Sequence, residues 1–176
     1  ARPWALPAST MPVIFGTSLA MVFGGVSLNV LHFVLAFLAM VILHSAANML
    51  SDIYDYEKGL DTQITPVSGA LVRGWLNVKQ VRSGSYILFI LGSSIGLILV
   101  LAVGKTLFII GTVGVLIGLF YSFLKYRAFG DLAVFLNFGI LGALGAWVVQ
   151  TGTFSWLPVI WTIPQSMLVS AILHAN

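Results

Sequence analysis

Six apolar segments of about membrane-spanning length follow one another along this 176-residue chain, with polar connections between them. A helix needs about 20 apolar residues to cross the hydrocarbon core of a bilayer, because each residue adds about 1.5 Å. Only helices and closed barrels satisfy every backbone polar group in that environment. We therefore predict an all-α fold, a polytopic transmembrane helix bundle, with helices over residues 8–23, 30–49, 81–103, 106–124, 132–150 and 157–173.

Charged residues make up 7% of the chain and lie mainly in the connections between these segments. Soluble proteins carry about 25% charged residues, so the composition indicates a polytopic membrane protein. Seven of the eight basic residues fall on one side of the predicted layout, and Lys105 alone falls on the other. The positive-inside rule then places the N-terminus and the charged loops, with all five acidic residues, at the cytoplasmic face. The chain contains no cysteine, which excludes disulfides and thiol chemistry.

Four of the five acidic residues lie between positions 52 and 61, directly after the second apolar segment. If residues 41–54 are helical, spacings of four, four and three residues separate His44, Asn48, Asp52 and Asp55. Side chains at these spacings project from one narrow sector of a helix. Ionisable residues at the edge of a membrane segment are costly, and a functional role is the default interpretation. A cluster of oxygen ligands at this place suits a magnesium ion that carries a phosphate.

The long connection between the second and third helices contains further basic residues. Residues 65–74 are typical of a loop with a short apolar stretch, and Arg73 lies at its end. Arg73 is either a two-point contact for phosphate oxygens or a loop charge that sets topology. Lys79 and Arg82 have the same two interpretations, with topology favoured.

A third polar cluster, residues 121–131, joins the fourth and fifth helices on the same side of the layout. Asp131 follows Gly130 and either stabilises the start of the next helix or pairs with nearby basic residues such as Lys125 and Arg127. Asn137 lies further along that helix, where an interhelical hydrogen bond is favoured over a substrate contact.

Small residues and histidines within the helices have structural interpretations. Glycines at positions such as 92, 96, 111 and 139 predict close helix packing. His44 shares the acidic face of the second helix, yet a lone histidine there is more often hydrogen-bonded to a neighbouring helix than bound to a metal. Nothing in the sequence resembles a zinc site, a Ser-His-Asp arrangement or a phosphate-binding glycine loop.

The run from Asn48 to Thr62 resembles the first aspartate-rich motif of the intramembrane prenyltransferases, the UbiA-type superfamily. Its Lys58-Gly59-Leu60-Asp61-Thr62 continuation is similar to that of the 1,4-dihydroxy-2-naphthoate polyprenyltransferases of menaquinone biosynthesis. Residues 2–4 with Pro12 and Val13, residues 130–135 and residues 150–152 resemble the same branch. The resemblance covers essentially the whole chain.

Members of this family have nine transmembrane helices and a second aspartate-rich motif after the sixth. Residues 173–176 resemble the segment that leads into that motif, with Asn176 as its first residue. The resemblance therefore implies that residues 1–176 form a single transmembrane prenyltransferase domain, incomplete at its C-terminus. It also implies that this piece is catalytically silent on its own.

The activity implied by the resemblance is the Mg²⁺-dependent transfer of a polyprenyl group from a polyprenyl diphosphate to an aromatic acceptor, 1,4-dihydroxy-2-naphthoate in the menaquinone branch. The metal ligands would be Asn48, Asp52, Asp55 and Asp61. Arg73 or Lys125 would stabilise the departing diphosphate together with Mg²⁺. The expected further substrate contacts are Lys58, Tyr121, Arg127, Asp131 and Asn137. The expected location is the inner or plasma membrane of a prokaryotic cell, with the lipid bilayer as a partner, no nucleic acid, and the site facing the cytoplasm.

Two alternatives stay open. In the first alternative the enzyme prenylates another acceptor, such as 4-hydroxybenzoate, a chlorophyllide or a glycerol phosphate. No sequence feature identifies the acceptor. The other alternative is a cation transporter or channel with the acidic cluster as its cation site. A pore needs polar residues through the middle of the bilayer, whereas the charge here is confined to one face, which favours the enzyme.

Overall fold

The computed structural model describes residues 5–60, 63–64 and 69–174, with only the backbone of residues 172–174. All regular structure within these ranges is helical, which confirms the predicted all-α class. The elements are α1 (Pro7–Phe23), α2 (Val30–Glu57), α3 (Val78–Val103), α4 (Lys105–Tyr126), α5 (Gly130–Val134), η2 (Phe135–Leu141), α6 (Gly142–Thr151), α7 (Leu157–Trp161) and α8 (Ile163–His174). The fifth predicted helix corresponds to α5, η2 and α6 in continuous succession, and the sixth corresponds to α7 and α8.

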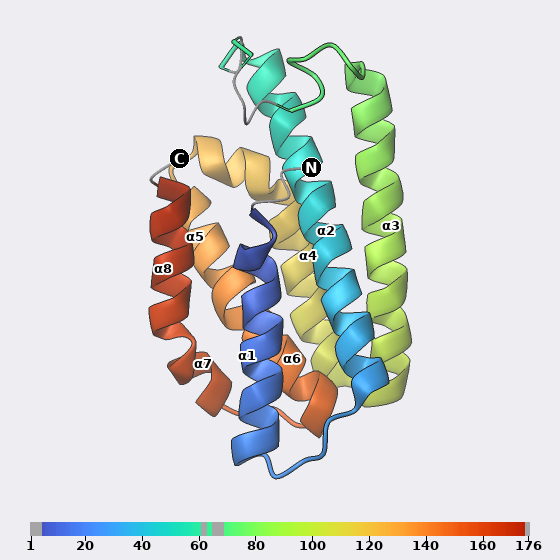
Figure 1. Cartoon of the computed structure of the whole chain (residues 1–176), viewed down its shortest axis with the longest axis vertical. Coiled ribbons are helices and arrows are strands. Elements are labelled where there is room, and N and C mark those ends of the chain that lie inside the picture. The colour runs from blue at the N-terminus through green and yellow to red at the C-terminus, as the bar shows by residue number, and fades with distance from the viewer. Residues whose placement is uncertain (1–4, 61–62, 65–68, 175–176) are drawn as a thin grey trace.

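The helices form a bundle in which successive long helices run in opposite directions (Figure 1). α2 packs mainly on α3, α1 packs on α6, and η2 packs on α8. By length and apolar composition α2, α3, α4 and the continuous stretch from Gly130 to Thr151 are each able to cross a membrane, and α1 is a shorter apolar helix. The end of α2 and the segment that leads into α3 lie at the top of Figure 1, and the turn between α3 and α4 lies at the opposite end. Lys105, which begins α4, is therefore far from the acidic end of α2.

The second helix continues to Glu57, so its predicted end at residue 49 was too early. No glycine or proline interrupts residues 50–57, and the aspartates on the inner face are accommodated by contacts inside the bundle. At the other end of α2, the Asn29 side chain accepts a hydrogen bond from the His32 backbone N–H at 3.0 Å and caps the helix. α3 begins in a similar way, with a capping box between Asn77 and Gln80.

Two departures from regular α-helix were not predicted. Residues Phe135–Leu141 form a π-helical segment, a local widening that often occurs at functional sites. The sixth helix breaks at Thr162, because Pro164 has no N–H to continue the hydrogen-bond ladder. The Thr162 hydroxyl instead donates to the Pro158 carbonyl at 2.6 Å, and its own carbonyl accepts from the Ser166 hydroxyl at 2.8 Å.

The glycines inside the helices divide into two groups. Gly92 and Gly139 confirm the predicted close packing, since a Cβ on Gly92 would lie 2.7 Å from Leu43 Cγ and one on Gly139 would overlap Ser166. Gly96 and Gly111 contradict it, because a Cβ at either position would meet nothing within 4 Å. Both glycines line an internal cavity, so their lack of a side chain leaves space within the bundle.

Candidate active site

The C-terminal third of α2 carries two buried carboxylates. Asp52 is 8% exposed and Asp55 is 7% exposed, although both lie near the polar end of the bundle. Lys125 Nζ, from the last turn of α4, lies 3.2 Å from Asp55 Oδ1 and 3.1 Å from Asp55 Oδ2. The Tyr126 hydroxyl donates to Asp55 Oδ1 as well. Asp55 therefore joins α2 to α4 through a cation and a phenol.

The loop that follows α2 covers Asp52. A Cβ on Gly69 would lie 2.9 Å from Asp52 Oδ2, so only glycine lets the loop backbone approach the carboxylate this closely. Leu71 secures the loop, because it is buried against Ile53 of α2 and Val81 of α3. The short apolar stretch of residues 65–74 therefore has a packing role through Leu71, which holds the loop against the acidic face of α2.

Asn48 lies one helical turn before Asp52 on the same face of α2. Its amide nitrogen Nδ2 is buried and has no hydrogen-bond partner among the described residues. A buried donor left without a partner costs about 1–3 kcal/mol, so it calls for an acceptor from outside the described residues. A phosphate oxygen would be such an acceptor.

The other predicted site residues lie around this cluster. Tyr121 packs beside the apolar cluster of Val134, Phe138 and Val169. Asp131 is exposed in the first turn of α5, where a carboxylate is favourable to the helix dipole. Asp61 lies outside the described residues.

Besides Lys125, whose Nζ lies 5.8 Å from the Tyr126 ring centroid, three basic residues named from the sequence lie on aromatic rings at the polar end. The Arg73 guanidinium stacks over Trp75 at 5.1 Å, Lys58 Nζ lies 5.7 Å from the Tyr54 ring centroid, and the Arg127 guanidinium lies 5.2 Å from that of Phe123. Arg82, by contrast, forms an exposed ion pair with Glu57 at 2.6 Å. Such pairs contribute little to stability.

The donor set fits a magnesium ion that shares its ligands with a substrate. Mg²⁺ prefers oxygen ligands and usually takes one or two carboxylates together with phosphate oxygens and waters. Asp52 and Asp55 supply the two carboxylates from one face of α2. No group of three or more His, Cys, Asp or Glu side chains converges within the described part of the chain. Asp52 and Asp55 could therefore hold an ion that also binds substrate oxygens.

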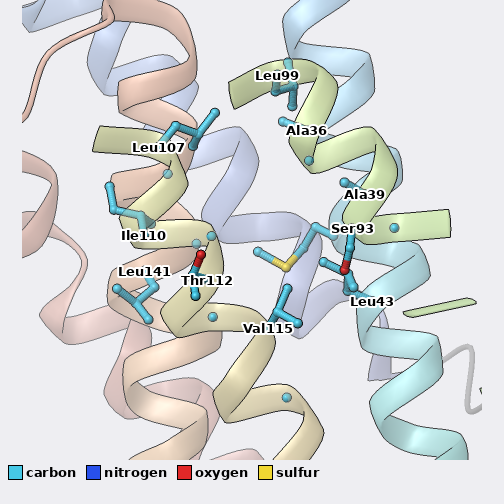
Figure 2. Close-up of a pocket in the computed structure, with 18 of the residues that line it drawn as sticks. Ala36, Ala39, Leu43, Ser93, Leu99, Leu107, Ile110, Thr112, Val115 and Leu141 are labelled. Carbon is cyan, nitrogen blue, oxygen red and sulfur yellow. The ribbon is translucent and has the colours of Figure 1, made fainter. Parts of the chain in front are cut away.

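An apolar cavity of about 340 Å³ lies in the bundle (Figure 2). Its walls come from α2, α3, α4, η2 and α6, and along α2 it extends from Ala36 to Ala47. This stretch of α2 is about 16 Å long. It ends one residue before Asn48, the first residue of the polar cluster. Figure 2 shows the hydroxyls of Ser93 and Thr112 among side chains that are otherwise apolar. The remaining polar lining residues are His44 and Asn137, and Asn137 lies in η2.

A buried acidic cluster beside an apolar cavity is the geometry expected from the resemblance, and residues 9–176 match the UbiA prenyltransferase family. The chain belongs to the UbiA prenyltransferase family. It is 33% identical over 182 residues to UbiA prenyltransferase domain-containing protein 1 of Xenopus tropicalis, with 99% of this chain and 52% of the relative covered. It is 31% identical over 183 residues to 1,4-dihydroxy-2-naphthoate octaprenyltransferase of Bacillus subtilis (strain 168), with 99% and 57% covered. The human UbiA prenyltransferase domain-containing protein 1 is 31% identical over 182 residues, with 99% and 53% covered.

The chain thus spans about half the length of the curated relatives that it matches. Its apolar helices and its membership of the UbiA family indicate an integral membrane protein. Sequence reasoning did not identify Tyr126, Gly69 or Ser9 as neighbours of the polar helix face. These contacts join different elements, and no spacing along the chain predicts them.

Proposed function

We propose that the protein containing this chain transfers a polyprenyl group from a polyprenyl diphosphate to an aromatic acceptor, in a reaction that depends on Mg²⁺. The observation that carries this proposal is the direct succession, along one face of α2, of an apolar cavity and a buried acidic cluster. An amphiphilic substrate with a long apolar tail and a polyanionic head needs both environments side by side. The name of the Bacillus subtilis relative supports 1,4-dihydroxy-2-naphthoate as the acceptor.

The acidic end of the site would hold the diphosphate. Asp52 and Asp55 would bind Mg²⁺, and the bound ion would supply Lewis-acid stabilisation of the leaving group. Lys125 would exchange its contact with Asp55 for the diphosphate, since its ammonium group lies at the mouth of the cluster. Asn48 Nδ2, which has no partner among the described residues, would donate to a phosphate oxygen. Together these groups balance the negative charge that grows as the allylic C–O bond ionises.

The cavity would hold the prenyl chain next to its diphosphate. Its walls are as apolar as the lipid in which the prenyl chain dissolves, so the chain enters without loss of apolar surroundings and is held by packing. An almost dry wall also keeps water from capturing the allylic cation before the acceptor ring attacks it. The ring carbon that attacks would meet the cation between Asn48 and the start of the cavity.

The site would open to the cytoplasm. Lys58, Arg73, Lys79, Arg82, Lys125 and Arg127 lie on the loops and helix ends at the same end of the bundle as the acidic cluster, and Lys105 lies at the other end. This distribution supports the orientation that the positive-inside rule predicts.

The proposal is tested with protein expressed from the complete gene and reconstituted in lipid vesicles. Prenyl diphosphates are supplied with Mg²⁺ and, in separate reactions, with 1,4-dihydroxy-2-naphthoate, 4-hydroxybenzoate, a chlorophyllide and glycerol phosphate. We expect prenylated naphthoquinol to be the main product, and none when Mg²⁺ is chelated. A different prenylated product would correct the acceptor, and the absence of any prenylated product would contradict the activity.

A further inference from the structure

His44 has a position in the site that the diphosphate chemistry does not use. It lies one helical turn before Asn48 on α2, is 5% exposed, and lines the apolar cavity. Its Nδ1 lies 2.7 Å from the Ser9 hydroxyl oxygen of α1, and its ring lies 4.4 Å from the ring centroid of Phe138 in η2. Among the described residues that line the cavity, it has the only imidazole, a ring whose neutral form has a nitrogen lone pair able to accept a proton.

The contact with Ser9 determines which ring nitrogen carries the proton. The Ser9 hydroxyl donates to the Leu6 carbonyl at 2.9 Å, which uses its single hydrogen. If that hydrogen pointed to His44 instead, lone pairs of Ser9 Oγ and of the Leu6 carbonyl oxygen would face each other across 2.9 Å. Ser9 Oγ therefore accepts from Nδ1–H, and Nε2 of the neutral ring keeps a free lone pair. The Leu6 carbonyl and the Ser9 hydroxyl thus favour the tautomer of His44 with the proton on Nδ1, which leaves Nε2 able to accept a proton.

The other polar groups of the cavity cannot take a proton. The Thr112 hydroxyl donates to the Phe108 carbonyl at 2.8 Å. Ser93 and Asn137 are able to form hydrogen bonds with a ligand, but a hydroxyl and an amide do not accept a proton near neutral pH. Around His44 itself, Ser9 of α1 and Phe138 of η2 do not titrate either, and Asp52 lies two turns further along α2.

We propose that Nε2 of His44 binds the ring hydroxyl of the aromatic acceptor and takes its proton as the ring attacks the prenyl group. This inference rests on the proposed prenyl transfer and adds the substrate class of the acceptor, a hydroxyaromatic ring with its hydroxyl directed to α2. A phenolate-like oxygen makes the ring carbon a stronger nucleophile than the neutral phenol does. The negative charge of the diphosphate and of Asp52, on the same helix face, stabilises the imidazolium that forms.

The proton and the electrons balance over the cycle. The O–H bond of the acceptor breaks, its proton bonds to Nε2, and the electron pair stays on oxygen. A ring carbon then forms the C–C bond to the allylic carbon, while the electron pair of the allylic C–O bond leaves with the diphosphate. When the same ring carbon loses its carboxyl group as carbon dioxide, the electron pair of that bond restores the aromatic ring. The oxygen takes its proton back from Nε2, and His44 is neutral again.

The test compares His44→Gln with His32→Gln in protein expressed from the complete gene. Glutamine keeps a polar group near the position of Nε2 but cannot take a proton. His32 is a matched control on the same helix, because its Nδ1 binds the Val149 carbonyl at 3.1 Å and it does not line the cavity. Two rates are measured for each variant. One is diphosphate release without acceptor, and the other is transfer to hydroxyaromatic acceptors whose hydroxyl pKa values lie below and above the assay pH.

We expect His44→Gln to release diphosphate within about twofold of the wild-type rate and to lose transfer by on the order of 10²–10⁴-fold. The loss should be largest for acceptors that are neutral at the assay pH and nearly absent for acceptors that are already ionised. Ser9→Ala should show a smaller loss with the same dependence on the acceptor, because it frees the tautomer without removing the base. His32→Gln should change neither rate.

An equal loss of transfer for all acceptors, or an equal loss of diphosphate release, would show that His44 is only structural and would overturn the proposal. If His44→Gln does not fold, the acceptor dependence of Ser9→Ala decides in the same way. Wild-type protein that transfers no prenyl group to any hydroxyaromatic ring would instead contradict the proposed function, and this inference with it.

Discussion

Lys125 Nζ lies within 3.2 Å of both carboxylate oxygens of Asp55, so one cation of α4 covers one of the two buried acids of α2. The carboxylate is only 10% exposed, whereas the lysine side chain is 39% exposed and has room to move. A metal ion that binds Asp55 has to compete with this ammonium group. The same group is then available to the diphosphate that the metal brings.

Substitution of Lys125 should separate these two effects. In Lys125→Met we expect half-maximal activity at a lower Mg²⁺ concentration, because the competing cation is gone. The maximal rate should fall on the order of 100-fold, because the leaving diphosphate loses a stabilising charge. Steady-state kinetics over a Mg²⁺ series measure both quantities. Lys105→Met, at the opposite end of the bundle, is the control and should behave as wild type; an unchanged maximal rate in Lys125→Met would refute the role in leaving-group stabilisation.

Gly111 should help to set the length of prenyl chain that the cavity accepts. Gly111→Leu fills open space beside the chain, so long donors lose contacts that short donors do not make. A loss of packing of about 1.4 kcal/mol for the displaced end of a long tail would lower the kcat/KM ratio of long to short prenyl diphosphates about tenfold. Gly111→Ala, whose Cβ has space, and Val113→Leu, which is 41% exposed, are the controls. An equal fall for short and long donors would show that the tail does not occupy this space.

The loop contact at Gly69 should matter for activity more than for stability. A methyl group at this position would lie 2.9 Å from Asp52 Oδ2, so the loop or the carboxylate has to shift. In Gly69→Ala we expect an increase of at least several-fold in the Mg²⁺ concentration for half-maximal activity and a thermal unfolding midpoint within about 2 °C of wild type. Gly84→Ala is the control, since its Cβ would meet only the flexible end of Met49. Unaltered Mg²⁺ dependence would mean that the loop does not shape the metal site.

Residues 1–176 contain no cysteine, so thiols introduced here report the orientation of this part of the protein once any cysteine elsewhere is replaced. Lys79→Cys, at the start of α3, and Thr153→Cys, after α6, place single exposed thiols at opposite ends of the bundle. An impermeant maleimide should label Thr153→Cys from outside intact cells and Lys79→Cys only after the membrane is opened. Labelling of both thiols from the same side would contradict the bundle topology, and the reverse pattern would contradict the cytoplasmic site.

The parts of the site that follow from local spacing could be predicted from the sequence. Asn48, Asp52 and Asp55 share a face because four- and three-residue steps fix it in any α-helix, and the structure places all three on the inner side of α2. The succession of apolar segments gave the helix order for a similar reason. The end of α2 was predicted too early, at residue 49, because the burial of Asp52 and Asp55 depends on contacts with other helices.

The parts that depend on contacts between elements could not be predicted. Gly92 and Gly111 look alike in sequence, yet one packs on Leu43 and the other faces open space. The break at Thr162 was missed although Pro164 accounts for it locally, whereas the tautomer of His44 depends on Ser9, 35 positions away. Periodicity carries no information about such partners.

The measurement that tests the central claim most directly is prenyl transfer by Asp52→Asn, with Glu57→Gln as the control. Both changes neutralise an acid in the same helix, but Asp52 is buried beside the cavity and Glu57 is in an exposed ion pair. Protein expressed from the complete gene is assayed at a fixed, ordinary Mg²⁺ concentration, with thermal unfolding as a check of the fold. We predict that Asp52→Asn folds and loses prenyl transfer by at least about 100-fold, while Glu57→Gln stays within about twofold of wild type. A folded Asp52→Asn protein that transfers the prenyl group at the wild-type rate would contradict the assignment of this acidic face to the diphosphate.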